Sequence, residues 1–153
     1  MTYNVGYDAA KKNLLVRLTD NDTGGLFSNE WITLDDIVNT IEKRPTPDTS
    51  FNAKIFTSLY KSQSVNNAGF LTAALKAENI LVSFKDSKRL HDLVDIKAFM
   101  DSMQPLIKVK VSLHDVVAER DAAKAKVRAE NERKLAASKA KTAAKALSKS
   151  TSK

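Results

Sequence analysis

The sequence predicts an α+β fold, in which a small domain with an N-terminal β-hairpin, four helices and short strands is followed by a long C-terminal helix and a basic tail. Apolar and polar residues alternate near the N-terminus, which is the period of a strand. Farther along, apolar residues recur at helical spacing between capping residues and prolines. From Leu113 onward the chain contains neither Gly nor Pro and is dominated by Ala, Lys, Arg and Glu, which are strong helix formers.

Length and composition set the number of domains. A chain of 153 residues has room for one modest domain and an appendage. Its hydrophobic fraction of 42% is too high for a wholly disordered chain. We expect a compact domain over residues 1–112, a protruding helix of mixed charge over 113–132, and a Lys- and Ala-rich tail over 133–153 that is a helix fraying beyond about Leu135 or is disordered.

The first elements are a hairpin and a loop. Residues 3–7 and 14–18 have a period of two and predict two strands, with residues 8–13 as the turn. Tyr3, Val5 and Tyr7 alternate with Asn4 and Gly6, and in the second segment Leu14, Val16 and Leu18 alternate with Leu15 and Arg17. Residues 20–25 form a loop, because Asn and Asp bond to nearby backbone and Gly permits positive φ. Their alternating carboxylates resemble the start of a calcium-binding loop, but Trp31 stands at the twelfth position, where a Glu is needed. We therefore expect a connecting loop and no metal site.

Two helices are expected next. The first begins at Thr33, because Thr33 and Asp36 have the spacing of a capping box. It runs to about Arg44, where Pro45 ends it. The second begins at about Asp48 and carries an apolar face.

A third helix is expected from about Asn67, after a polar turn at residues 63–66. The second and third helices together have the outline of a helix-turn-helix. The would-be recognition helix contains no arginine, so we expect a packed helical hairpin rather than a reader of base sequence. Its polar groups are Asn66, Asn67, Thr72, Lys76 and Glu78.

The end of the domain is predicted to contain two strands and a fourth helix. Residues 80–84 are short and β-branched, as in a strand. Asp86 can cap a helix that ends before Pro105. Residues 106–111 alternate apolar residues with lysines, which predicts a half-buried strand with a basic outer face. The expected apolar residues of the fourth helix are Leu90, Leu93, Val94 and Met100.

The last helix is expected to start at a second capping box, formed by Ser112 and Asp115. Its apolar residues are too sparse and out of phase for a stable coiled coil.

The charge is concentrated at the C-terminus. The formal net charge is +7, and residues 133–153 contain seven basic residues and no acidic one. The other 18 Lys and Arg equal the 18 Asp and Glu, so residues 1–132 are formally neutral. A segregated block of like charge favours an external polyanion. The seven basic residues are Arg133, Lys134, Lys139, Lys141, Lys145, Lys149 and Lys153.

The tail predicts sequence-independent binding to nucleic acid, with DNA favoured over RNA. Lysines recur every four residues from Lys141 to Lys153, so a helix would place them in one stripe, and like charges oppose that helix until a polyanion neutralises them. Phosphate contacts of this kind are steeply salt-dependent. No aromatic residue interleaves the lysines, which argues against base stacking. Six residues could extend this surface toward the domain: Lys108, Lys110, Arg120, Lys124, Lys126 and Arg128.

The Ala-Lys-Ser-Thr composition of these twenty-one residues is similar to that of linker-histone and bacterial nucleoid-protein tails, and the resemblance implies DNA compaction. It is compositional and indicates no family.

No catalytic site is predicted. His91 is placed in the fourth helix and His114 in the first turn of the last helix, both as surface or boundary residues. The sequence has no Walker loop, no GxGxxG and no HExxH motif. We expect neither an enzyme nor a bound cofactor.

The resulting hypothesis is a non-enzymatic nucleic-acid-binding protein whose residues 1–112 associate with themselves or with a protein partner. The alternative is a structural, assembly or regulatory module whose tail contacts an acidic protein surface. The absence of cysteine, of a signal segment and of a long apolar stretch favours a cytoplasmic protein without membrane contact, nucleoid-associated if it binds DNA. The short length and lack of familiar motifs suggest a phage-encoded accessory protein.

Overall fold

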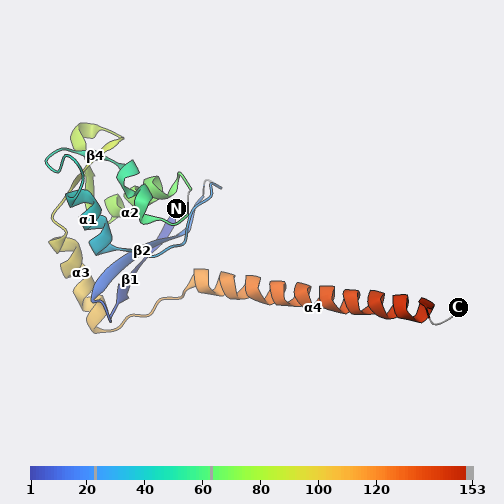
Figure 1. Ribbon diagram of the computed structural model, residues 1–153. Coiled ribbons are helices and arrows are strands. Elements are labelled where there is room, and N and C mark those ends of the chain that lie inside the picture. The colour runs from blue at the N-terminus through green and yellow to red at the C-terminus, as the bar shows by residue number, and fades with distance from the viewer. Residues whose placement is uncertain (23, 63, 151–153) are drawn as a thin grey trace. The chain divides into compact units, whose positions relative to one another are not determined.

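The computed structural model describes residues 1–22, 24–62 and 64–150, without the side chains of residues 86 and 140–150. The fold is mixed α+β, as the sequence predicts, with two three-stranded antiparallel sheets and a long C-terminal helix (Figure 1). The chain divides into two units, Met1–Ser112 and Leu113–Lys153.

The first sheet contains the predicted hairpin. Strand β1 (Thr2–Asp8) pairs with β2 (Asn13–Asp20), and β2 pairs with the short β3 (Ile32–Thr33) on its other side. The central strand β2 is buried on both faces over most of its length. Helices α1 and α2 cover one face of this sheet (Figure 1).

Helix α1 (Leu34–Glu42) begins at the predicted cap. The Asp36 backbone N–H donates to Thr33 Oγ1 over 3.1 Å, and the Thr33 hydroxyl donates to the Asp36 carboxylate over 2.6 Å. Asp36 thus reaches back to the Thr33 hydroxyl instead of the backbone N–H of a regular capping box. The helix stops just before Arg44, whose guanidinium donates to the backbone carbonyls of residues 41, 47 and 49 and so holds the proline-containing loop.

The predicted second helix from about Asp48 is wrong in its start and its type. The segment forms strand β4 (Phe51–Asn52) and then the 3₁₀ helix η1 (Ala53–Leu59). The Asn52 side chain accepts from the Lys54 backbone N–H over 3.0 Å, so this cap sets a later start.

The third helix is confirmed as α2 (Asn67–Ala77). Its residues Leu71, Ala74 and Leu75 are fully buried. It ends in a Schellman motif, in which the Ile80 N–H donates to the Leu75 carbonyl and the Asn79 N–H to the Lys76 carbonyl.

The predicted fourth helix with Leu90 and Leu93 is wrong. Strand β5 (Leu81–Ser83) agrees with the prediction, but η2 (Phe84–Asp86) and strand β6 (Leu90–Leu93) follow it. The second sheet has the order β4-β6-β5, and His91 in its central strand pairs with Phe51 and Ser83. The apolar spacing of residues 90–94 fits a helix, but pairing with two other strands overrides it.

Helix α3 (Lys97–Lys108) replaces the predicted strand over residues 106–111, and Pro105 lies inside the helix. Phe99 is buried, and Ile96, Met103 and Ile107 pack against the core from the same helical face. These contacts hold the last turn even though proline removes one helical hydrogen bond.

The last helix, α4 (Val116–Ser150), has a different cap from the predicted one. The Asp115 carboxylate accepts from the Ala118 N–H over 2.8 Å, so Asp115, and not Ser112, is the N-cap. The helix continues to Ser150, and the expected fraying beyond about Leu135 stays a prediction. Lys153 lies outside the described residues.

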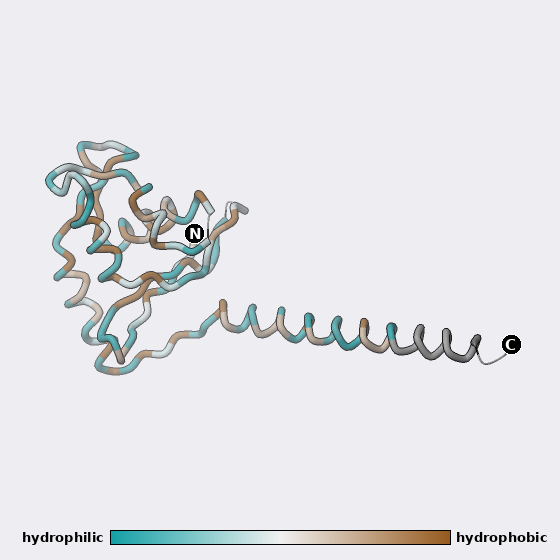
Figure 2. The backbone as a smooth tube through the Cα atoms, in the orientation of Figure 1, coloured by the Kyte–Doolittle hydropathy of each residue, from teal (hydrophilic) through white to brown (hydrophobic). Residues whose placement is uncertain are grey.

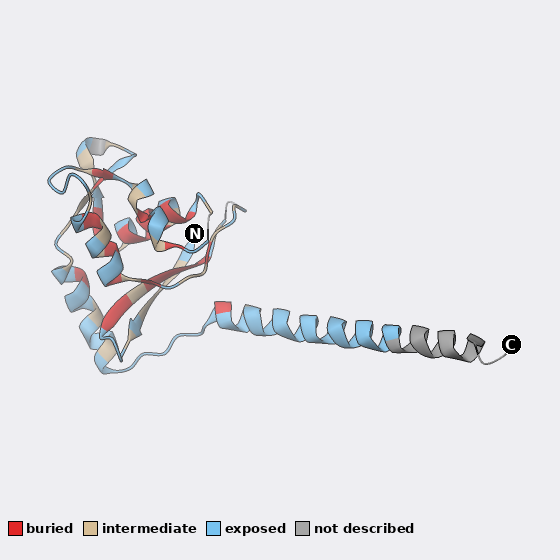
Figure 3. Cartoon of the chain, viewed as in Figure 1, coloured by how far each residue is buried: buried red, intermediate tan, exposed pale blue. Residues whose placement is uncertain are grey.

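The main hydrophobic core cluster lies in the first unit. Buried residues gather on β2, α1 and α2, whereas α4 is exposed throughout residues 121–139 (Figure 3). Apolar and polar residues are interspersed along residues 116–139 of α4 (Figure 2). This helix therefore has no buried face over residues 121–139 and presents its side chains to solvent there.

Candidate nucleic-acid interface

Helix α4 has two halves of different charge. Its 35 residues correspond to a length of about 52 Å at 1.5 Å per residue. Residues 116–132 hold four basic and four acidic residues, whereas residues 133–150 hold six basic residues and no acidic one. The proximal charges are Arg120, Lys124, Lys126 and Arg128 against Glu119, Asp121, Glu130 and Glu132.

The proximal half neutralises much of its own charge through ion pairs along the helix. Lys124 lies 3.8 Å from the Asp121 carboxylate, and Arg128 lies 3.5 Å from that of Glu132. Both pairs are well exposed, so each stabilises the helix little. These ion pairs nevertheless place a carboxylate beside Lys124 and beside Arg128, which are both predicted to contact phosphate. A phosphate that binds either residue must compete with that carboxylate.

One ion pair marks the junction of the two halves. Lys134 Nζ lies 2.6 Å from Glu130 Oε1, at the supportive i,i+4 spacing. Arg133 and Lys139 form no ion pair with any carboxylate of the described residues, and both are exposed. The basic half therefore begins at Arg133, with the last acidic residue one position earlier.

The helical backbone brings the predicted lysine row onto one side. Positions 141, 145 and 149 are four residues apart, so each is turned by only about 40° from the one before. Position 134 is seven residues before 141 and lies on nearly the same side. Position 139 is two residues before 141 and lies on the far side, so positive charge is carried on more than one side of α4.

Lys108 and Lys110, which were predicted to extend the basic surface toward the domain, do not lie on a strand. Lys108 is in the last turn of α3, and Lys110 follows with φ 51° as the left-handed residue of a Schellman motif. Both belong to the first unit. The sequence-based grouping of these two lysines with α4 therefore stays a prediction.

Three of the five polar residues of the would-be recognition helix are engaged in hydrogen bonds within the fold. Asn67 is 1% exposed, and its Oδ1 accepts from the Ser28 backbone N–H over 2.9 Å. Thr72 is buried and donates to the Ala68 carbonyl over 2.8 Å. Glu78 accepts from the Tyr3 hydroxyl over 2.6 Å, and burial together with this carboxylate raises the pKa of Tyr3 to about 12. These groups are not free to read bases, which supports the packed helical hairpin.

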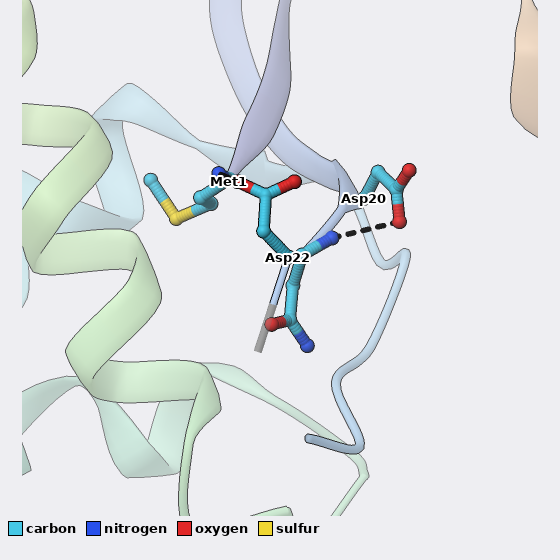
Figure 4. Close-up of polar contacts among 4 residues, drawn as sticks. Met1, Asp20 and Asp22 are labelled. Atoms are coloured by element: carbon cyan, nitrogen blue, oxygen red, sulfur yellow. Dashed lines mark hydrogen bonds and ion pairs between the residues drawn. The ribbon is translucent and has the colours of Figure 1, made fainter. Parts of the chain in front are cut away.

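The carboxylates of the loop after β2 do not converge. The Asp20 carboxylate accepts from the Asn21 backbone N–H over 2.8 Å, and the Asp22 carboxylate lies 2.5 Å from the Met1 ammonium nitrogen (Figure 4). Across the described residues, no three His, Cys, Asp or Glu side chains are grouped so as to hold a metal ion.

Both histidines lie in other elements than the sequence predicts, because His91 is in a strand and His114 precedes α4 instead of lying in its first turn. His91 is in strand β6 and is only 4% exposed, and its buried Nδ1 has no hydrogen-bond partner. Burial lowers its pKa, with a further contribution from Lys76. His114 is exposed as predicted, and its Nε2 lies 2.9 Å from Glu119 Oε2. His91 is thus a buried residue of the second sheet whose ring packs edge-on against Phe51.

No protein-family model, curated protein or solved structure matches this chain. The described residues include no helix that is both long and apolar enough to cross a membrane.

Sequence reasoning missed an aromatic–cation contact on the first sheet. The Arg17 guanidinium lies 4.4 Å from the ring centroid of Trp31 and is 3.5 Å from Asn4 Oδ1. The same indole lies so close to Gly6 that an added Cβ would come within 2.9 Å of it. The glycine in the middle of a predicted strand was the one available signal, because Gly in a strand often marks close approach of another group.

Proposed function

We propose that this protein binds nucleic acid, with double-stranded DNA the favoured form, largely independently of sequence and without catalysis. The observation that carries the proposal is the charge pattern of α4: a half with balanced charges leads into residues 133–150, which carry six basic residues, no acidic residue and about 27 Å of helix. An exposed helix with unbalanced positive charge gains free energy by releasing the counterions condensed on a phosphate backbone.

The pattern favours phosphate contacts over base reading. Arg133 is the sole arginine of the basic half, so bidentate contacts to guanine are few. The basic half contains no aromatic residue, so bases have no stacking platform and duplexes are preferred to single strands. The proximal half then acts as a spacer between the basic half and the folded domain.

The test compares two variants with the same change in net charge. One replaces Lys139, Lys141, Lys145 and Lys149 of the basic half by Gln. The other replaces four exposed lysines of the first unit by Gln: Lys11, Lys54, Lys88 and Lys97. Gln has nearly the helix propensity of Lys, so α4 is kept.

Binding to an unrelated duplex DNA is measured across a salt series. We expect the unchanged chain to bind with a slope of log K against log salt that is about 0.9 steeper for each phosphate contact. The α4 variant should lose most of that slope, and the domain variant should keep it. Equal loss in both variants would contradict a site on α4 and indicate a general charge effect.

The second candidate is a structural or regulatory module whose basic half contacts an acidic protein surface. The same charge pattern supports it, because carboxylates can neutralise lysines as phosphates do. Absence of DNA binding by the full chain at low salt would favour this candidate.

A further inference from the structure

Strand β1 lies at one edge of the first sheet, and its outer side is unpaired. It pairs with β2 on its other side (Figure 1). Within the described part of the chain, no backbone–backbone hydrogen bond outside the strand pairs involves residues 2–8. An unpaired edge presents a row of N–H and C=O groups to which a further strand can bind.

The sequence of β1 lacks the features that usually protect an edge strand. The strand has seven residues, whereas about five or six are typical, and it contains neither Pro nor Lys. Its one register shift lies at the first step, between Thr2 and Tyr3, so the pairing is regular from Tyr3 to Asp8. The backbone of this edge is therefore long and regular enough to accept another strand.

The two exposed aromatic side chains of the described residues flank this edge. Tyr7 of β1 is 40% exposed, and Trp31 is 41% exposed. The indole of Trp31 lies across Gly6 of β1, where an added Cβ would come within 2.9 Å of it. Tyr7 is on the same side of the strand as Tyr3 and Val5, which pack against the core, and Gly6 is on the opposite side. A further strand would thus cover one aromatic side chain on each face.

The side chains of β1 are self-complementary. Residues 3–7 read Tyr-Asn-Val-Gly-Tyr, with Tyr at both ends, a polar or small residue next to each Tyr, and Val5 at the centre. In an antiparallel pairing of two copies centred on Val5, Tyr3 lies opposite Tyr7 and Asn4 opposite Gly6. This register keeps the core-facing side chains of both copies on one face. A shift by one residue would place Tyr3 opposite Gly6 and mix the two faces.

We propose that β1 pairs antiparallel with β1 of a second copy of this chain, about a twofold axis through Val5. The first sheets of the two copies then form one continuous sheet. The cross-strand pairs of Tyr3 with Tyr7 and of Val5 with Val5 stabilise it. The contact is small beside the roughly 20–30 residues per side of a stable interface, so the dimer is weak and concentration-dependent.

The test uses single cysteines, because the sequence contains none of its own. Val5→Cys places a thiol at the twofold axis, where the two Cβ atoms are roughly 4.5–5.5 Å apart. Tyr7→Cys is the matched control, because it lies in the same strand and is more exposed than Val5. In the proposed register the two copies of residue 7 are four residues apart along the strands, or about 14 Å.

Both full-length variants are treated, without nucleic acid, with a short bismaleimide that spans a cross-strand pair but not four residues. We expect Val5→Cys to be crosslinked about tenfold faster than Tyr7→Cys, because only its thiols are held close together. Random collisions would favour the more exposed Tyr7→Cys. Urea unfolding followed through Trp31 checks that both variants are folded.

The mass of the unchanged chain, measured by sedimentation equilibrium, needs no substitution and should rise with concentration. A chain that stays monomeric at every concentration would overturn the proposal. Equal crosslinking of folded Val5→Cys and Tyr7→Cys would overturn it too, as would a rising mass with neither variant crosslinked, since association would then use another surface. The DNA titration described above is independent of these outcomes.

Discussion

Replacing Asn67 by Ala should destabilise the first unit without weakening DNA binding. Asn67 is 1% exposed and is the acceptor for the Ser28 backbone N–H, which is itself in a residue only 8% exposed. Loss of the acceptor leaves that buried N–H without its partner, which costs about 1–3 kcal/mol. The two bonds donated by its amide to Ser62 measure 3.4 and 3.5 Å and add little.

The neighbouring asparagine provides the control. Asn66 is exposed, forms no side-chain cap of α2, and donates to the Leu26 carbonyl over 3.3 Å. Asn66→Ala should lower the free energy of unfolding by less than about 0.5 kcal/mol. The two variants therefore differ in burial and not in chemistry.

The assay is urea unfolding followed through the fluorescence of Trp31, the one tryptophan in the sequence. A loss of 2 kcal/mol corresponds to a fall of about 10 °C in the melting temperature for a unit of this size. Equal stabilities of the Asn67→Ala and Asn66→Ala variants would refute the role given to the buried amide. A marked drop in DNA affinity in a folded Asn67→Ala chain would instead restore the recognition-helix hypothesis.

Three other predictions concern the first unit. Gly6→Ala should displace the indole of Trp31, lower stability by about 1–3 kcal/mol and shift the tryptophan emission, since the added Cβ would come within 2.9 Å of the ring; unchanged emission would contradict this packing. Lys110→Gly should raise the melting temperature, with a gain of up to about 1 kcal/mol, because φ is 51° there, and Lys110→Ala should give no such gain. The free energy of unfolding should fall as the pH drops below 6.5, because His91 has a lowered pKa in the folded chain and therefore takes up a proton more readily in the unfolded chain. His91→Gln should make stability less dependent on pH between pH 7 and 5. An unchanged slope would assign the pH dependence to other groups.

Several parts of the fold could be predicted because local chemistry determines them. The alternation in residues 3–7 and 14–18 predicts the hairpin, and the Thr33 cap predicts the start of α1. Helix α2 followed from an apolar face of 3.6-residue period, of which Leu71, Ala74 and Leu75 are fully buried in the structure. Each of these patterns depends on interactions between residues that are close in the sequence.

The secondary-structure predictions were wrong where contacts with residues distant in the sequence determine the structure. Residues 90–93 have the apolar spacing of a helix, yet they form the central strand of a sheet whose partners begin at Phe51 and Leu81. Residues 106–108 alternate like a strand, yet they complete α3 because Ile107 packs against the core. Short segments carry too little periodicity to settle such cases alone.

The candidate site divides in the same way. The charge block at residues 133–153 and the four-residue lysine spacing from Lys141 onward follow from the amino-acid order alone, because charge and spacing do not depend on folding. Tertiary structure decided that Asn67 is buried and that Leu26 and Val65 stand exposed on adjoining loops. Burial depends on which surfaces meet when distant segments pack, and no local pattern in the sequence contains that information.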